Sequence, residues 1–388
     1  MAHGSDDFGF GEDHEILRDG AKRFLAERCP IEAVRRLAVD PVGHDPGLWK
    51  EMAELGWTGL VIPEAHGGAG LGSLHQALLL EEMGRRLLPS PYLGTALASL
   101  AILRAGDEAQ QARWLPGIAR GQTVASLAWL EPDGSWEPGD VAATARREGD
   151  GFVLSGTKTH VMAGAHAGLV VAPFRLDDGL AGGAPGEDAE VVLFVLEAGT
   201  PGLTVQPEVS IDATRRTARL ELRDVRVDAG TRLARAGTGV WADVLLQATA
   251  WLAAEMVGAA EGVLAMTRDY AIDRKQFGRQ IGSFQAVKHP LVNDMIGIEM
   301  ARTHAYAAAA AYDLDPDAPA TGARMAKALV SDVLATAVRH GVQFHGGYGF
   351  TLDCDVHFYF KRALFCRAML GDGPHHRRHL ALELFADA

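Results

Sequence analysis

Hydrophobic residues recur at helical spacing through the first third of the chain. Leu17, Ala21, Phe24 and Leu25 fall on one face of a helix predicted at residues 12–29. The same period predicts four further helices, at residues 45–57, 73–88, 91–106 and 107–121. The chain therefore begins with a helical segment that ends near residue 121.

Capping residues support two of these helices. Asp45 stands before Pro46, which suits the first helical position, and Ser73 is a second predicted N-cap. The glycine-rich stretch at residues 66–72 lacks the G-x-G-x-x-G spacing of a phosphate loop. We therefore interpret it as a helix connection capped by Ser73.

The middle of the chain changes to short stretches rich in β-branched and aromatic residues, separated by turn sequences such as EGDG and GTPG. Six strands are predicted, at residues 123–131, 142–148, 152–162, 168–174, 189–197 and 217–227. The sequence predicts no long helix between them, so these strands are not expected to build parallel βαβ units. An antiparallel barrel or sandwich follows.

Helical period returns from about residue 232, in three long stretches at residues 241–277, 283–314 and 320–344. The first would span about 50 Å, because an α-helix rises ~1.5 Å per residue. Long helices joined by short loops indicate an antiparallel bundle. Their alanine-rich faces suggest burial on several sides, as in the core of an oligomer.

The predicted fold class is therefore α+β, in three consecutive domains. They are an N-terminal helical domain at residues 1–121, a central antiparallel β-barrel at residues 122–231 and a C-terminal bundle of four long helices at residues 232–388.

Composition and charge narrow the classes of function. The formal net charge of -13 argues against a general attraction to nucleic acid or to anionic membranes. Cys29, Cys354 and Cys366 form no CxxC pair, so a disulfide framework is not expected. The acidic, polar start has no signal-peptide core, and no apolar run reaches the ~18 residues of a membrane span. We expect a cytoplasmic protein without membrane insertion.

Two loops combine glycines with polar side chains. The first places Arg274 and Lys275 beside the amides of Gln276 and Gln285 at a predicted helix corner. Arginine is the side chain best suited to a pyrophosphate. The second begins HGGYGF, where glycines let a ligand approach the main chain or let φ be positive. Taken alone, these loops could equally be a polar helix corner and a helix-terminating loop.

A pair of histidines near the C-terminus has the spacing of metal ligands on one helix face. His375 and His379 are four residues apart, but no carboxylate or cysteine in that stretch completes the set, and Arg378 lies between them. We expect a basic helix start there, and no metal site.

Four motifs together resemble the acyl-CoA dehydrogenase superfamily. They read YAIDRKQFGRQIGSFQAVKH, QFHGGYGFT, VIPEAHGGAGLG and GFVLSGTKTHVMAGAHA, and they fall in all three segments in the family's order. The resemblance implies the same helix–sheet–helix fold that periodicity predicts. It also implies FAD-dependent α,β-dehydrogenation of an acyl-CoA thioester, with an electron acceptor such as an electron-transfer flavoprotein.

By the same resemblance, the glycine loop lies against the FAD bound by a neighbouring subunit. The implied FAD contacts are Arg274, Gln276, Phe277, Gln285, Gln343, Gly346 and Gly347, with Val161 in the flavin pocket. Because each site is completed across a dimer interface, we expect a homo- or heterotetramer, which agrees with the alanine-rich faces.

The base that removes the α-proton is missing from both positions where the family keeps it. These positions hold Leu370 and Ala248. Glu255 lies about two turns beyond Ala248 in the apolar run WLAAEMVGAA, where a desolvated carboxylate could serve as the base. The alternatives are that Glu255 pairs with a bundle arginine or borders a subunit contact, or that Asp372 is the base.

The flavin pocket departs from the family as well. The family's W-[IS]-[TS] run is His160, Val161 and Met162 here, and Leu130 replaces a threonine. Met162 cannot supply the hydroxyl that usually hydrogen-bonds flavin N5, and such bonds tune flavin reactivity.

Three functions therefore remain open. The chain could dehydrogenate a bulky acyl-CoA ester, since its tail is especially similar to actinobacterial family members that act on such esters, steroid side chains among them. It could be the non-catalytic partner subunit of a heteromeric acyl-CoA dehydrogenase. It could also be a flavin oxidoreductase of this fold that acts on a carrier-protein thioester.

Overall fold

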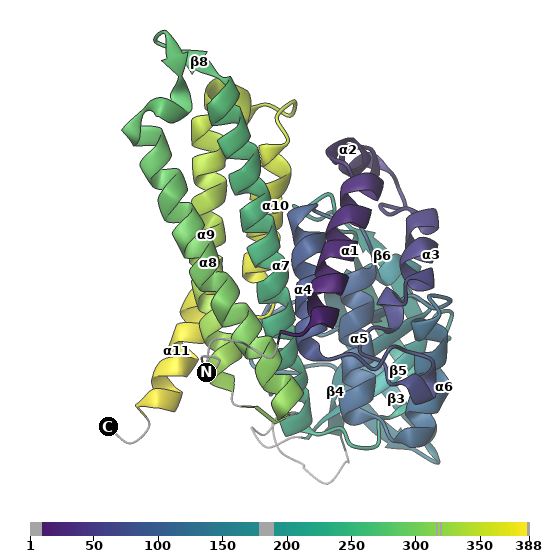
Figure 1. The fold of residues 1–388 in the computed structure, drawn as a ribbon. Coiled ribbons are helices and arrows are strands. Elements are labelled where there is room, and N and C mark those ends of the chain that lie inside the picture. Colours follow the sequence, from purple (N-terminus) through teal and green to yellow (C-terminus); the bar gives the residue numbers. More distant parts are fainter. Residues whose placement is uncertain (1–9, 178–189, 316, 319, 386–388) are drawn as a thin grey trace.

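The structure is a computed structural model that describes residues 10–177, 190–315, 317–318 and 320–385. Helices flank a central sheet, and the long helices form a column beside the rest of the chain (Figure 1). The N-terminal part contains α1 (Glu12–Arg28), α2 (Ile31–Val39), α3 (Pro46–Glu54), α4 (Ser73–Arg85), α5 (Tyr92–Ala105) and α6 (Glu108–Ala119). Periodicity predicts five of these helices, and α2 is additional.

The two predicted caps have different outcomes. Asp45 caps α3, because its Oδ1 accepts from the backbone N–H of Gly47 at 2.8 Å, with Pro46 in the first turn. The prediction for Ser73 is wrong, because Asp313 of α8 (Gln285–Leu314) accepts from the first N–H groups of α4. The Ser73 hydroxyl instead accepts from Trp251 Nε1 at 2.8 Å. A cap supplied from 240 residues away lies beyond local sequence signals.

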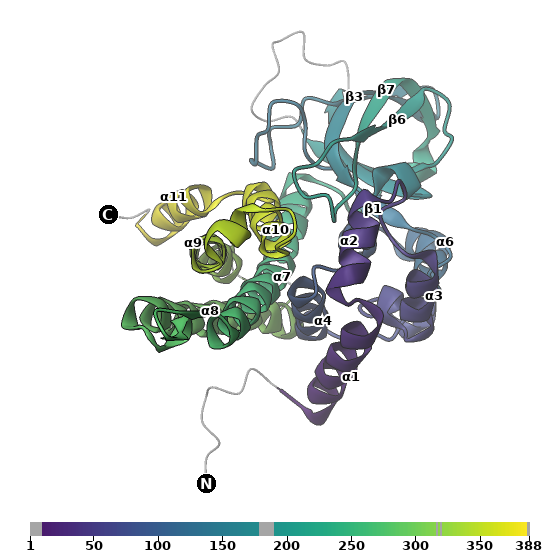
Figure 2. The ribbon, with the colours of Figure 1, turned by 90° about the horizontal axis from the view of Figure 1, so that it is seen from above.

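The central segment folds into a sheet domain, as predicted, but the sheet is open, curled and mixed, so the predicted antiparallel β-barrel is wrong. Its strands are β1 (Ala125–Leu127), β2 (Thr144–Glu148), β3 (Gly151–Met162), β4 (Leu169–Asp177), β5 (Val191–Glu197), β6 (Leu203–Glu208) and β7 (Thr217–Asp228). They are ordered β1-β4-β2-β3-β7-β6, with β5 also paired to β4. Among the described strands, β5 and β6 each pair on one side only, so the sheet stays open (Figure 2).

Two parallel pairings explain the difference. Both β1 and β2 run parallel to β4, with Ala125 opposite Leu169 and Thr144 opposite Arg175. A parallel pair needs a connection of about a dozen residues or more. Strand β3 and the turn after it provide that connection from β2 to β4, so the lack of helices does not exclude parallel pairing.

The C-terminal part is the predicted bundle of long helices. It consists of α7 (Thr238–Asp273), α8, α9 (Ala320–Phe344) and α10 (Val356–Ala368), followed by α11 (Gly373–Leu384). Helix α7 runs from the sheet to a tip where β8 (Lys275–Gln276) and β9 (Arg279–Gln280) form a small hairpin, and α8 runs back (Figure 1). Helix α9 returns to the same tip, which brings both glycine-containing loops to one end of the bundle.

Glycines fix a close crossing of α4 and α7. A Cβ at Gly258 would lie 1.8 Å from the carbonyl oxygen of Glu81, and one at Gly84 would lie 2.0 Å from that of Glu255. The two backbones therefore touch, and this contact seats the middle of α7 against the N-terminal part.

Helix α7 is the one described helix that is long and apolar enough to cross a membrane, yet 72% of its qualifying window is buried inside the fold. Such burial is typical of a helix in the core of a folded protein. The cysteines Cys29, Cys354 and Cys366 are all buried, and none of the three is paired.

Candidate active site

The loop between α10 and α11 carries the first base position. Leu370 and Gly371 both have positive φ, at 57° and 89°. The fully buried Lys327 holds this turn, because its Nζ donates to the Gly371 carbonyl at 2.7 Å, and burial lowers the pKa of Lys327 to about 7. Asp372 accepts from the His375 N–H at 2.9 Å as the N-cap of α11. The family's base position therefore presents a hydrocarbon side chain, and the nearby carboxylate caps a helix.

Leu370 lines a small cavity of about 40 Å³ between α7, α11 and the loop after β1. Its other lining residues include Trp129, Trp136, Glu137, Thr249, His375 and His379. An acyl chain is far larger than this cavity, so it would have to displace side chains to enter at this point.

Glu137 supplies the carboxylate that local sequence reasoning did not find beside the histidine pair. Its Oε1 lies 3.0 Å from His379 Nε2 and 3.7 Å from His375 Nδ1. Arg378 also donates to this oxygen at 2.9 Å. Burial opposes ionisation of Glu137, but His379 and the other neighbouring cations hold its pKa below the ordinary value. The arginine already compensates this carboxylate, which disfavours a metal ion there.

The second base position, Ala248, is fully buried on α7. Two turns further along, Glu255 is also buried, but its expected apolar surroundings are not found. Its Oε1 accepts from Arg362 Nη1 at 2.7 Å and from Arg215 Nη2. The arrangement matches the alternative in which Glu255 pairs with arginines.

A buried ionic cluster surrounds this glutamate. Arg362 donates to Thr214 Oγ1 at 2.6 Å and forms a second ion pair with Asp212. Burial opposes the charge of Arg362, but Asp212 and Glu255 together raise its pKa. Asp212 is held ionised in turn, because Arg362 and Thr214 lower its pKa against the cost of burial. The cluster ties the turn before β7 to helices α7 and α10.

The flavin-pocket positions lie at the end of β3. His160 is exposed with φ at 53°, and Val161 is buried and paired with Ala218 of β7. The carbonyl of Met162 accepts from Ser126 Oγ at 2.5 Å, and its Sδ lies 3.3 Å from Arg215 Nη1.

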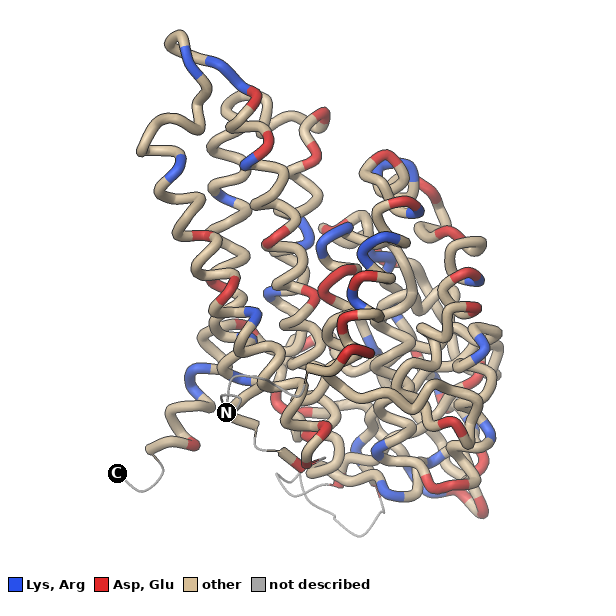
Figure 3. The backbone as a smooth tube through the Cα atoms, viewed as in Figure 1, with Lys and Arg blue, Asp and Glu red and all other residues tan. Residues whose placement is uncertain are grey.

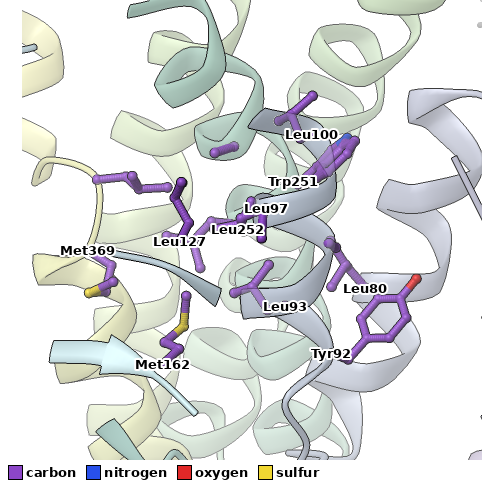
Figure 4. Packing of buried hydrophobic residues seen from close by; sticks show 14 of the residues in the cluster. Leu80, Tyr92, Leu93, Leu97, Leu100, Leu127, Met162, Trp251, Leu252 and Met369 are labelled. Atoms are coloured by element: carbon purple, nitrogen blue, oxygen red, sulfur yellow. The ribbon is translucent and has the colours of Figure 1, made fainter. Parts of the chain in front are cut away.

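Met162 belongs to a tightly packed apolar cluster between α5, α7 and the end of α10 (Figure 4). Leu93 and Leu97 come from α5, Leu252 from α7, and Met369 from the residue after α10. Hydrocarbon side chains thus pack against one side of Met162, while Arg215 contacts its sulfur.

The remaining implied cofactor contacts gather at the bundle tip. They are Arg274, Gln276, Phe277 and Gln285 around the β8–β9 hairpin, and Gln343, Gly346 and Gly347 after α9. Tyr270 stacks on His345 with ring centroids 4.3 Å apart, which joins the two loops. The hairpin carries several positive charges, visible at the top of the bundle (Figure 3).

The tip is open to a ligand. Phe277 is 91% exposed, and Gly346 has φ at 63°. Apart from its chain neighbours, no described residue has an atom within 4 Å of a Cβ placed at Gly346 or Gly347. The main chain of the tip is therefore accessible from outside, whereas Met162 at the end of β3 is buried.

One chain does not bring the two groups of residues together. Val161 and Met162 end strand β3, whereas the hairpin formed by β8 and β9 lies at the tip of the bundle, far from β3 in Figure 1.

Sequence reasoning missed two buried features of this region. Lys158 Nζ lies 2.5 Å from Glu131 Oε1, and burial lowers the pKa of Lys158 to about 8. Arg215 links Glu255 to Met162. The polar run DATRRT before an alternating strand is the one signal that could have drawn attention to Arg215.

Three family models match the chain in consecutive order. They are "Acyl-CoA dehydrogenase, N-terminal domain" at residues 11–122, "Acyl-CoA dehydrogenase, middle domain" at residues 126–225 and "Acyl-CoA dehydrogenase, C-terminal domain" at residues 235–385.

Individual relatives match over nearly the whole chain. Acyl-CoA dehydrogenase IpdE2 of Mycobacterium tuberculosis is 34% identical over 353 residues, which cover 91% of each chain. Acryloyl-CoA reductase (NADH) of Anaerotignum propionicum is 29% identical over 97% of this chain and 96% of the relative. The solved ChsE4–ChsE5 complex from Mycobacterium tuberculosis contains a chain that is 29% identical, with a TM-score of 0.88 over 98% of this chain and 99% of that chain.

Proposed function

This chain belongs to the acyl-CoA dehydrogenase family, and we propose that it takes part in FAD-dependent α,β-dehydrogenation of an acyl-CoA thioester as one subunit of an oligomer. When bound, the flavin would accept the β-hydrogen of the acyl group as a hydride. The electrons would then pass to an acceptor such as an electron-transfer flavoprotein. The residues of the chain must bind the dinucleotide and position the thioester.

The observation that best supports this proposal is the open tip of the helix bundle. Arg274 would pair with the diphosphate of FAD, while Gln343 and the glycines Gly346 and Gly347 let the backbone approach it closely. Because β3, which ends at Val161 and Met162, lies far from the tip of its own chain (Figure 1), residues of two subunits would hold each FAD.

A second candidate role follows from the base positions. Leu370 and Ala248 cannot accept a proton, Asp372 caps α11, and Glu255 is bonded to two arginines. These observations favour a chain that contributes FAD contacts and structure while a different subunit supplies the base. The carrier-protein thioester is a third candidate, and no residue described above favours it.

The first experiment purifies the chain alone and with candidate partner subunits, and records the flavin absorbance. Arg274→Ala removes one charge-assisted contact of roughly 1.5–3 kcal/mol, so FAD should bind about 10- to 100-fold more weakly. Arg113→Ala is the matched control, because Arg113 is an exposed arginine that pairs with Glu197 on another face. A chain that binds no FAD with excess cofactor and any partner would contradict the proposal.

Substrate bleaching then separates the two candidate roles. If the chain alone loses its flavin absorbance on addition of an acyl-CoA, it carries its own base. If bleaching needs a second type of subunit with a glutamate at either base position, the chain is the partner subunit.

A further inference from the structure

A histidine lies beside the base position that Leu370 occupies. His375, in the first turn of α11, lines the cavity of about 40 Å³ together with Leu370 and Thr249. Thr249 directly follows Ala248 on α7. The cavity thus adjoins both backbone positions from which the family presents its base, and an imidazole is exposed to it.

The two edges of the His375 ring have different surroundings. Its Nδ1 lies 3.7 Å from Oε1 of Glu137. The opposite edge lies over Gly371, because a Cβ placed at Gly371 would be 2.5 Å from Cδ2 and 3.2 Å from Nε2 of His375. Among the described residues, none forms a hydrogen bond with this Nε2. Nε2 is therefore the ring atom that is available to a substrate next to Leu370.

His375 is uncharged at neutral pH. Its side chain is 8% exposed, and burial, together with His379 and Arg378, lowers its pKa to about 4, although Glu137 opposes the shift. With Nδ1–H directed towards Glu137, the lone pair is on Nε2, where it can accept a proton. The carboxylate of Glu137 would then stabilise the imidazolium that forms, as the carboxylate of a catalytic triad does.

The other side chains of the cavity that could accept a proton are already engaged. Glu137 accepts from Arg378 at 2.9 Å, and its Oε1 lies 3.0 Å from Nε2 of His379. His376 donates from Nε2 to the carbonyl of Leu370 at 2.8 Å, and its Nδ1 is buried too deeply for a ligand in the cavity to reach. One imidazole nitrogen is left free at the cavity.

We propose that His375 is the base that removes the α-proton of the thioester, and that Glu137 stabilises its charged form. This inference rests on the proposed function and gives the chain its own base. The α-proton would pass to Nε2, the electron pair of the α-C–H bond would form the α,β double bond, and the β-hydrogen would leave as a hydride to FAD. The thioester would take the place of the Trp136 ring, which packs edge-on against His375 with centroids 5.4 Å apart.

The first test measures reduction of the flavin-loaded oligomer of this chain by butyryl-, octanoyl- and cyclohexanecarbonyl-CoA in stopped flow. His375→Gln removes the basic nitrogen, so reduction should slow about 10²–10⁴-fold while the FAD content stays that of the parent. Adding Leu370→Glu to this variant supplies a carboxylate at the family's position and should restore part of the rate. His304→Gln is the matched control, because His304 lies on α8 and does not line the cavity.

The second test needs no hydride transfer. 3-Thiaoctanoyl-CoA has a sulfur atom in place of the β-carbon, so it has no β-hydrogen to lose. A base in the site still exchanges its α-protons with deuterium from ²H₂O, which mass spectrometry detects. The parent should exchange these protons, and His375→Gln should exchange them about 10²–10⁴-fold more slowly.

Parent-like reduction and exchange in His375→Gln would overturn the proposal, provided that urea unfolding shows a folded variant. Reduction that requires a second type of subunit would overturn it as well, and the proposed function would then stand. If the parent exchanges α-protons through His375 but no thioester reduces the flavin with any partner, the dehydrogenation fails and the base assignment stands. If none of the thioesters binds, both are wrong.

Discussion

Replacing Glu255 by glutamine tests how this buried carboxylate is used. The substitution keeps the size of the side chain and removes its charge, so Arg215 loses the carboxylate it is paired with. Arg362 keeps Asp212 as its second partner. Removing one member of a buried ion pair costs about 3–5 kcal/mol of stability, because the other charge stays buried without compensation. We expect a loss of stability near 3 kcal/mol, the lower end of this range, because the amide oxygen of glutamine can still accept a hydrogen bond from the arginines.

Urea unfolding followed by tryptophan fluorescence measures this loss, at fixed protein and FAD concentrations. Removing the guanidinium as well, in Glu255→Gln with Arg215→Met, should restore part of the stability, because no uncompensated charge remains at that position. Glu148→Gln is the matched control. Glu148 is an exposed glutamate paired with Arg226, and its loss should cost less than about 1 kcal/mol.

A different outcome would support Glu255 as the base. In that case Glu255→Gln would unfold at the urea concentration of the parent and still bind FAD. Reduction of the flavin by an acyl-CoA would instead fall about 10²–10⁴-fold in stopped-flow measurements. That pattern would refute the structural role that the two arginine contacts indicate.

Three further predictions concern pH, packing and assembly. Lys327 has a pKa of about 7 in the fold, below its unfolded value. Above pH 7 the folded chain therefore releases a proton that the unfolded chain still holds. The free energy of unfolding of the parent should rise relative to that of Lys327→Met by about 1.4 kcal/mol per pH unit, up to the unfolded pKa. Parallel profiles of unfolding free energy from pH 6.5 to 9 would contradict this. Gly258→Ala should cost about 1–3 kcal/mol of stability in the same urea assay, because it forces α7 away from α4. Its control is Gly239→Ala in the same helix, which has open space around it and should be neutral or stabilising by up to about 1 kcal/mol. Sedimentation should show a flavin-loaded dimer or larger, and a flavin-loaded monomer of 41.4 kDa would exclude sites shared between subunits.

The order of helices, strands and long helices could be read from the sequence, because local backbone geometry sets the spacing of apolar residues in each. The helix cap at Asp45 and the paired motifs around Arg274 and Gly346 are similarly local. They depend on residues a few positions apart, and the bundle then brings the two motifs to one tip.

The ion-pair partners of Glu255 are determined by the tertiary structure alone. Its neighbours on α7 are apolar, so the local sequence indicated an apolar groove, but its partners Arg215 and Arg362 are 40 and 107 residues away. The same is true of Asp313 capping α4, of Glu137 beside His379 and of the parallel pairing of β2 with β4. Each of these contacts depends on which surfaces of the chain pack together. A buried charge is paired with residues that are close in space but distant in sequence, and the periodicity of the sequence does not specify those residues.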